Sequence, residues 1–524
     1  MQNYKINEFA AQSSITQVAS YFDIVDNAVK TGDTNKRYSV TTNACNAPAC
    51  PIKNGGWTSF VISPQGDNMC DLYNSFITVH MKVKIRGVDG RSFSNKKKNA
   101  QQPMIWVGFK DSMDCISQYQ LLANGQAFYT QSNALEESYI TNLATPESVK
   151  QSDIFSKVRH KDIWKYKIKD GRMGCYLGTS DNDVEKDIYL KIDIRRFLPL
   201  STIKMLPQFA GNFEIRVKLS SEGMVCTPVG PQATFGRNLC SAPAEADGSI
   251  AGQTNKFMPI GTELTAYKSI DMSQSGASYC TTGKFTPTVS SFEVVDAFSH
   301  LSSFGLDDNL YQSLVNRYTK ESLSFPVPTL TFQGMNGQPA RGGAYDFTLT
   351  ATPRFVDTIY LLLQKNQAHK TCYENPGFTN FTLKMGSYGV IPDIQYESTS
   401  AAFYELCCNA FNTNNDLAGF SKDVKESLVS SKNTYTGSES LDVSNFVMAF
   451  PVSTDFTYQQ GQTSNSPITY QLKAASNSDS PFYENTSCIP VMGFLKDSVL
   501  AIQLRPVGPP IVALDDYDIT SPSE

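Results

Sequence analysis

The sequence has few of the side chains on which catalysis and metal binding depend. It contains 4 histidines in 524 residues, and none has metal-ligand spacing to another His, Cys or Glu. The patterns H-E-x-x-H, G-x-S-x-G and the P-loop are absent. The glycine-rich stretch GMNGQPARGG (334–343) lacks the Lys-Ser/Thr pair that grips phosphate, so a hairpin loop is its preferred interpretation. We therefore expect a non-enzymatic protein with no cofactor and no metal.

The sequence also lacks the marks of membrane insertion and secretion. No stretch approaches the roughly 18 apolar residues that span a bilayer, and the start, MQNYKINEFAAQSS, has no signal-peptide core. The net charge is -5, so no whole-surface basic footprint for nucleic acid exists. We expect a protein made in the cell interior, without a transmembrane segment.

The spacing of the 12 cysteines does not indicate a disulfide framework either. They spread from Cys45 to Cys488 without a C-x-x-C, which favours reduced and mostly buried thiols. Cys45 and Cys50 are five residues apart, and whether they close a small loop stays open.

What the chain does contain favours β-structure. It has 31 Phe and 25 Tyr, which suit pleated, half-buried surfaces, and 33 Gly and 26 Pro scattered between short apolar runs. Its 40% hydrophobic and 18% charged residues are ordinary for a folded chain. No βαβ rhythm and no short repeat appear, which argues against Rossmann folds, TIM barrels, propellers and solenoids. The predicted class is all-β with a few short helices.

The clearest element is a strand from Phe76 to Arg86. Its residues alternate with period two, which only a strand sorts onto two faces. The apolar face is Ile77, Val79, Met81, Val83 and Ile85, and the polar face is Thr78, His80, Lys82, Lys84 and Arg86. One face must be buried, and the other lies in water or against a partner.

Other elements follow from local signals. Asn124-Gly125 predicts a type I′ hairpin turn, 134–143 and 306–319 predict helices, and 400–411 predicts a third helix. The acidic pairs Glu136-Glu137, Asp307-Asp308 and Asp515-Asp516 read as caps and solvated faces rather than as acid/base pairs. Lys165, Lys167 and Lys169 alternate with aromatic and apolar residues; a Lys-defended sheet edge is preferred, and a basic patch for nucleic acid is the alternative.

These elements predict five divisions. Residues 1–56 form an arm, 57–222 a first β-domain, 223–288 a junction with a long loop, 289–512 a second β-domain, and 513–524 a loose acidic tail.

Three segments carry a resemblance to a known family: FVISPQGDNMCDLYNSFITVHMKVKI, WVGFKDSMDCISQYQLLANGQAFYTQSNALEESYITN and FLPLSTIKMLPQFAGNFEIRVKL. In the second half TLTATPRFVDTIYLLLQ adds to it. The order of segments resembles hexon-like, double-jelly-roll major capsid proteins of eukaryotic DNA viruses, those of Polinton/Maverick elements and adintoviruses above all. The resemblance implies two consecutive jelly-roll β-sandwiches and no active-site residues.

The same resemblance implies a role and partners. It implies homotrimers that form pseudo-hexagonal capsomers of an icosahedral shell, penton and minor capsid proteins as partners, and a place in the virion. His80, Lys82, Lys84 and Arg86 are then candidate contacts to a neighbouring jelly roll or subunit. A viral spike or lectin-like binding module stays open as an alternative, as does, more weakly, a carbohydrate-active β-enzyme.

Overall fold

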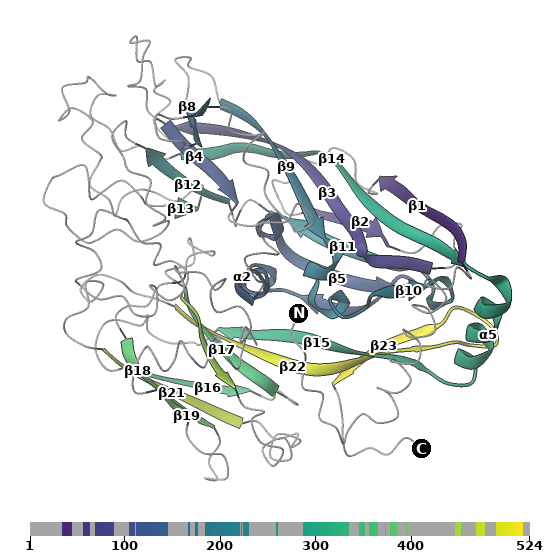
Figure 1. The fold of residues 1–524 in the computed structure, drawn as a ribbon. Helices are drawn as coiled ribbons and strands as arrows, with labels where there is room; N and C mark the ends of the chain where they lie inside the picture. Colours follow the sequence, from purple (N-terminus) through teal and green to yellow (C-terminus); the bar gives the residue numbers. More distant parts are fainter. Residues whose placement is uncertain are drawn as a thin grey trace, which may run out of the picture.

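The structure of the protein is a computed structural model in which four β-sheets lie in successive layers (Figure 1). It describes residues 34–44, 56–62, 69–87, 104–109, 112–144, 166–167, 173–176, 184–220, 222, 224–229, 258–259, 287–334, 345–351, 356–364, 373, 378–385, 394–396, 446–451, 468–476 and 489–516.

The first two layers form one β-sandwich. Sheet I has the order β1-β14-β3, with β9 and β10 along the other edge of β3. Its strands are β1 (Thr34–Ala44), β3 (Met69–Gly87), β9 (Val184–Asp193), β10 (Met205–Pro207) and β14 (Pro287–Leu306). Sheet II has the order β2-β11-β5-β6. Its strands are β2 (Trp57–Val61), β5 (Ile116–Ala123), β6 (Gln126–Gln131) and β11 (Phe213–Leu219).

The next two layers form a second sandwich. Sheet III has the order β15-β22-β17-β20, with β23 also paired to β22. Its strands are β15 (Leu323–Gly334), β17 (Val356–Gln364), β20 (Met448–Pro451), β22 (Ile489–Gln503) and β23 (Ile511–Asp516). Sheet IV has the order β16-β21-β18-β19. Its strands are β16 (Tyr345–Ala351), β18 (Phe378–Met385), β19 (Ile394–Tyr396) and β21 (Ile468–Ser476).

Both sandwiches follow one connection rule. The eight principal strands of the first sandwich are, in chain order, β1, β2, β3, β5, β6, β9, β11 and β14. By their place in this order, the strands of sheet I stand first–eighth–third–sixth, and those of sheet II stand second–seventh–fourth–fifth. Sheets III and IV repeat these two orders with β15 to β22. This arrangement of two Greek keys on eight strands is a jelly roll. The predicted all-β class and the two consecutive jelly rolls are confirmed.

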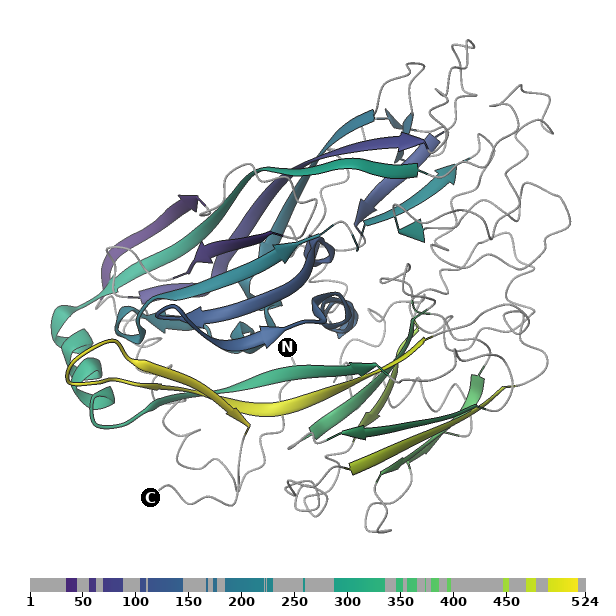
Figure 2. The same cartoon turned by 180° about the vertical axis from the view of Figure 1, so that it is seen from behind.

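A fifth sheet stands apart from the layers, at the end of the first sandwich away from α5 (Figures 1 and 2). Its order is β13-β12-β4-β8-β7, and it is built from three connections between strands of the first sandwich. The strands are β4 (Met104–Phe109), β7 (Tyr166–Lys167), β8 (Met173–Tyr176), β12 (Met224–Val229) and β13 (Met258–Pro259). We call it the tip sheet.

Short helices connect and cover the strands. Helix α2 (Ala134–Ala144) lies between the sandwiches, and α5 (Asp308–Tyr318) joins β14 to β15 (Figure 1). Asp307 caps α5 by accepting from the backbone N–H of Asn309 at 3.1 Å. The 3₁₀ helices are Ser112–Cys115, Ile194–Arg196, Leu198–Leu200 and Gln208–Ala210.

The two apolar cores meet at the seam between the sandwiches. The first fills the space between sheets I and II and continues to Phe325 and Leu500 of sheet III. The second fills the space between sheets III and IV and includes Tyr139 of α2 and Leu198 from the first sandwich. Each sandwich therefore completes part of the other's core, and the two pack as one body.

Several predicted elements are confirmed. Ile77, Val79 and Met81 of β3 are buried while Thr78, His80 and Lys82 are half-exposed. The hairpin turn has φ of 52° at Asn124 and 81° at Gly125, as a type I′ turn requires. The helices predicted at 134–143 and 306–319 are α2 and α5, and the helix predicted at 400–411 lies outside the described residues.

The strand pairings differ from the expected divisions at several places, among them β12, which lies within the expected junction and pairs with β4 of the tip sheet. β1 lies within the expected arm, and β14 begins inside the expected junction and continues into the second β-domain, yet both pair in sheet I. β23 covers the start of the expected loose tail and pairs with β22. In each case the pairing partner is a whole strand elsewhere in the fold, which local composition does not reveal.

Candidate functional site

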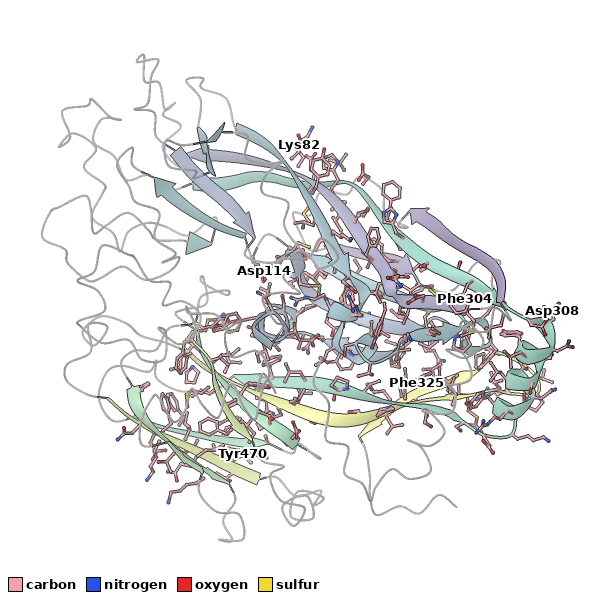
Figure 3. The ribbon with its side chains drawn as sticks, viewed as in Figure 1. Lys82, Asp114, Phe304, Asp308, Phe325 and Tyr470 are labelled. Atoms are coloured by element: carbon pink, nitrogen blue, oxygen red, sulfur yellow. The ribbon has the colours of Figure 1, made fainter. Side chains whose placement is uncertain are left out.

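The outer face of sheet I carries the predicted contact residues. Alternation along β3 sends His80 and Lys82 to the side away from the core, and Figure 3 shows Lys82 pointing away from the molecule. Lys84 and Arg86 also belong to β3, but their side chains lie outside the described residues. We call this side of sheet I the outer face.

Acidic residues of the neighbouring strands stand opposite the basic residues of β3. Lys82 stands opposite Asp187 of β9 on one side and Glu293 of β14 on the other. Lys84 stands opposite Glu185 of β9. Opposite charges in facing positions stabilise a sheet by a few tenths of a kcal/mol each. The outer face therefore carries charges of both signs. The sequence analysis did not predict these acidic neighbours, because they come from strands more than 100 residues away.

His80 is the centre of one row across the outer face. Its ring stacks on Tyr189 of β9, with ring centroids 4.2 Å apart. Its Nε2 lies 3.2 Å from Asp187 Oδ1, and its Nδ1 lies 3.5 Å from Asp296 Oδ2. These contacts hold the imidazole between Asp187 and Asp296, stacked on an exposed aromatic ring.

A second cluster on the same face surrounds Phe76. The ring of His300 stacks on it at 4.7 Å, and Lys191 Nζ lies 4.3 Å from its centroid. His300 Nε2 lies 2.8 Å from Thr78 Oγ1. Burial of the ring, together with the nearby Lys191 ammonium, lowers the pKa of His300, which favours a neutral imidazole at pH 7.

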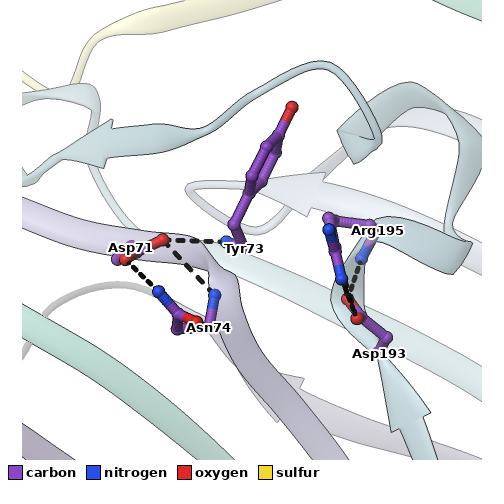
Figure 4. A network of polar contacts seen from close by, with 5 residues as sticks. All are labelled: Asp71, Tyr73, Asn74, Asp193 and Arg195. Atoms are coloured by element: carbon purple, nitrogen blue, oxygen red, sulfur yellow. Dashed lines mark hydrogen bonds and ion pairs between the residues drawn. The ribbon is translucent and has the colours of Figure 1, made fainter. Parts of the chain in front are cut away.

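Polar anchors fix the strand next to this face (Figure 4). Asp71 accepts from the backbone N–H groups of Tyr73 (3.0 Å) and Asn74 (3.3 Å) and from the Asn74 amide (2.7 Å). At the end of β9, Arg195 donates to Asp193 at 2.6 Å and lies over the Tyr73 ring. These contacts stand where the partner of β3 changes from β10 to β9, so they hold the bend between the two pairings.

The outer face of sheet IV is different in chemistry. Asp346, Thr348 and Thr350 of β16 and Lys473 of β21 are exposed there, and Gln471 donates to Asp346 at 2.8 Å. Among the described side chains, the exposed large apolar ones include Tyr189 (48%) and Val295 (39%) of sheet I and none of sheet IV. The outer face of sheet I thus combines apolar area with charges, while the outer face of sheet IV has threonines and the facing pair Asp346 and Lys473 without exposed large apolar side chains among its described residues.

The prediction that Glu136 and Glu137 are solvated was wrong. Both are buried, because α2 lies between the sandwiches rather than on the surface. Among the described residues, no group of three or more His, Cys, Asp or Glu side chains is placed to hold a metal ion. No helix in the described ranges is long and apolar enough to span a membrane.

Other predicted residues are only partly placed. Lys167 is the second residue of β7 in the tip sheet, and its side chain lies outside the described residues. Lys165 and Lys169, and the pair Cys45 and Cys50, lie outside them too. The cysteines with described side chains, Cys70 and Cys115, are buried thiols, as predicted for this chain, and Cys115 Sγ donates to the carbonyl of Ser112 at 3.2 Å. The basic-patch alternative stays a prediction.

These features define the class as an all-β protein of two packed jelly rolls with an extra sheet at one end. No protein-family model matches the sequence, and no curated protein matches it. The fold is that of the crystal structure of the mavirus major capsid protein, with a TM-score of 0.52 at 11% identity over 93% of this chain and 93% of that chain.

Two further solved structures are similar at lower scores. A chain of the cryo-EM structure of the Sputnik virophage gives a TM-score of 0.49 at 10% identity, covering 92% of this chain and 91% of that one. PBCV-1 VP54 gives 0.41 at 10% identity, covering 91% and 97%. At these identities the likeness concerns the fold alone.

Proposed function

We propose that the protein is a major capsid protein that assembles as homotrimers into the icosahedral shell of a virus. The observation that carries the proposal is the shared fold with the mavirus major capsid protein along nearly the whole of both chains. Three copies supply six jelly rolls, and six similar units around one axis give a pseudo-hexagonal building block that tiles a closed shell. The role is structural and places the protein in the virion, with penton and minor capsid proteins as further partners.

The strand pairings support a revised division of the chain. We assign the first jelly roll to 34–306 and the second to 323–503, with α5 between them. The tip sheet is then an elaboration of the first jelly roll, at the end opposite α5. This end fits the outward side of a shell, where long inter-strand connections find room.

The outer face of sheet I is the proposed contact between copies. Its exposed Tyr189 and Val295 provide apolar area, and Lys82 alternates with acids of both neighbouring strands. A surface with both signs interspersed complements a second copy of itself better than a polyanion or a purely basic partner. The polar outer face of sheet IV is the matched surface for which no contact is proposed.

The test uses the purified full-length chain. Light scattering should give three times the 57.8 kDa chain mass, and negative-stain images should show hexagonal outlines. Stable monomers without such outlines contradict the proposal. Tight, specific binding on a glycan array by a monomer or dimer supports a lectin-like module instead, and hydrolysis abolished by one carboxylate substitution supports an enzyme.

A further inference from the structure

A carboxylate lies fully inside the seam between the two sandwiches. Glu137 of α2 has 1% of its surface exposed. Its Oε1 accepts from Tyr119 Oη at 2.5 Å and from the backbone N–H of Leu198 at 3.4 Å. Its Oε2 accepts from Gln131 Nε2 at 2.6 Å, and Tyr129 Oη lies 3.4 Å away. The carboxyl group therefore sits in a cage of donors from three separate segments of the first sandwich.

The same donors hold the second sandwich. Gln131 Nε2 also donates to the backbone carbonyl of Leu330, on β15, at 2.7 Å. Tyr129 Oη lies 3.3 Å from that carbonyl. Because an amide has two N–H groups, Gln131 binds the Glu137 carboxylate and the second sandwich at once. A change in the charge of Glu137 therefore acts on a group that spans the seam.

Hydrogen bonds rather than an opposite charge supply the partners of this carboxylate. Burial raises the pKa of Glu137 to about 7, against the lowering effects of its four donors, with Tyr119 first among them. The titratable and charged groups on the packed elements include Tyr119 (β5), Tyr129 (β6), Asp114 and Cys115 (the 3₁₀ helix before β5), Arg195 and Arg196 (the 3₁₀ helix after β9), Glu136 and Tyr139 (α2), and Tyr373, which lies against Tyr139. The Arg196 guanidinium donates to the carbonyl and hydroxyl of Ser138, at 3.3 and 3.4 Å.

We propose that Glu137 is a proton-linked tie between the two jelly rolls, firm when the carboxyl group is protonated and weakened when it ionises. A buried anion without a cation favours any opening that returns it to water. The closed seam binds the proton more strongly than the opened one, so the stability of the seam is full below the carboxyl's ordinary pKa and falls as the pH rises toward about 7. Above that pH the loss is complete, and the dependence levels off.

The tie belongs to a single chain and does not rest on the proposed capsid role. A monomeric protein has the same seam, so failure to form trimers leaves the inference intact. If capsids do form, each subunit becomes less rigid at neutral and alkaline pH than in acid.

The test is hydrogen exchange of the full-length protein, followed by mass spectrometry of β15 and α2 peptides between about pH 5 and 8 and corrected for intrinsic exchange. In the wild type the equilibrium constant for opening of the seam should rise by up to about tenfold per pH unit and level off near pH 7. Glu137→Gln should remove this dependence. Glu214→Gln, on neighbouring β11, is the matched control and should keep it.

A second variant tests the same inference by a shift. Tyr119→Phe removes the shortest donor, so the levelling-off should move to higher pH while the ring volume is kept. Equal pH dependence in the wild type and Glu137→Gln overturns the inference. If Glu137→Gln does not fold, Tyr119→Phe decides: a plateau at unchanged pH overturns the tie, and a plateau at higher pH supports it.

Discussion

Strand β3 of the first sandwich and strand β17 of the second occupy the same position, third in chain order within their jelly rolls. They differ in exposure. Along Ile77 to Lys82 of β3, buried and half-exposed side chains alternate, whereas eight of the nine residues of Val356–Gln364 are buried. The sequences reflect this, since FITVHMK alternates and VDTIYLLLQ runs nearly continuously apolar.

The difference arises from what covers each sheet. Sheet III has sheet IV on one side and parts of the first sandwich on the other, where Tyr139 of α2 donates to the carbonyl of Phe446 and its ring lies tilted against that of Tyr373, with centroids 4.3 Å apart. Over the outer face of sheet I, no element of the described ranges packs. The comparison teaches that the second jelly roll buries both faces of this sheet within the chain, while the first leaves one face that no described element covers.

The largest expected effects come from the core of the two equivalent strands. Leu361→Ala and Leu362→Ala, at adjacent and fully buried positions of β17, should each cost about 2–5 kcal/mol of unfolding free energy. On β3, Met81→Ala should cost a similar amount, but Lys82→Ala should stay within about 0.5 kcal/mol in the monomer. Urea unfolding measures each value. A cost below 0.5 kcal/mol for one of the two leucines would show that β17 has an open face.

An intermediate effect is expected at a close approach within sheet III. Gly493 of β22 faces Phe332 of β15, and a Cβ on Gly493 would lie 2.7 Å from Phe332 Cε1. Gly493→Ala should therefore lower the free energy of unfolding by about 1–3 kcal/mol, because the added methyl group overpacks this contact. Adding Phe332→Ala should recover part of that loss. Gly334→Ala, with no atom within 4 Å of its Cβ, is the control and should change little in the same unfolding experiment.

A smaller effect is expected where the two sandwiches are joined by a turn. Asn124 accepts from the backbone N–H of Asn212 at 3.0 Å and donates to the carbonyl of Pro510, before β23, at 3.0 Å. Asn124→Ala loses both hydrogen bonds and leaves alanine at a positive φ, which is unfavourable for a residue with a Cβ. The free energy of unfolding, measured by thermal unfolding, should therefore fall by about 1–2 kcal/mol. Asn124→Gly loses the bonds without the strain. If both variants cost nothing, the turn does not join the sandwiches.

Local sequence patterns predicted what local chemistry determines. The two faces of β3, the Asn124-Gly125 turn and helix α5 all follow from period, turn chemistry and capping. The alternation in β3 also predicted that the outer face of sheet I lies either in water or against a partner. Composition and strand patterns sufficed for the all-β class, whereas the two jelly rolls were expected from the resemblance of four sequence segments to a known family.

The same local patterns did not predict which strands, distant in the sequence, pair with one another. β14 joins β3 although Glu293 and Lys82 are far apart in the chain, and its serine-rich sequence has no clean period. The acids that stand opposite Lys82 are contributed by other strands, so the face looked basic when read from β3 alone. Glu137 was misread as solvated because only tertiary packing buries α2. Contacts across sheets set burial and charge partners, and these are not local properties.

The most direct test of the proposed contact through sheet I compares charge reversal on the two outer faces. Lys82→Glu places a third acid between Asp187 and Glu293, whereas Lys473→Glu makes an equivalent change opposite Asp346 on sheet IV. Mass photometry across a dilution series, with thermal unfolding to verify the fold, gives the trimer affinity of each. We predict at least about tenfold weaker assembly, or about 1.4 kcal/mol, for Lys82→Glu alone. Equal assembly of both variants and the wild type would contradict the proposed contact through sheet I.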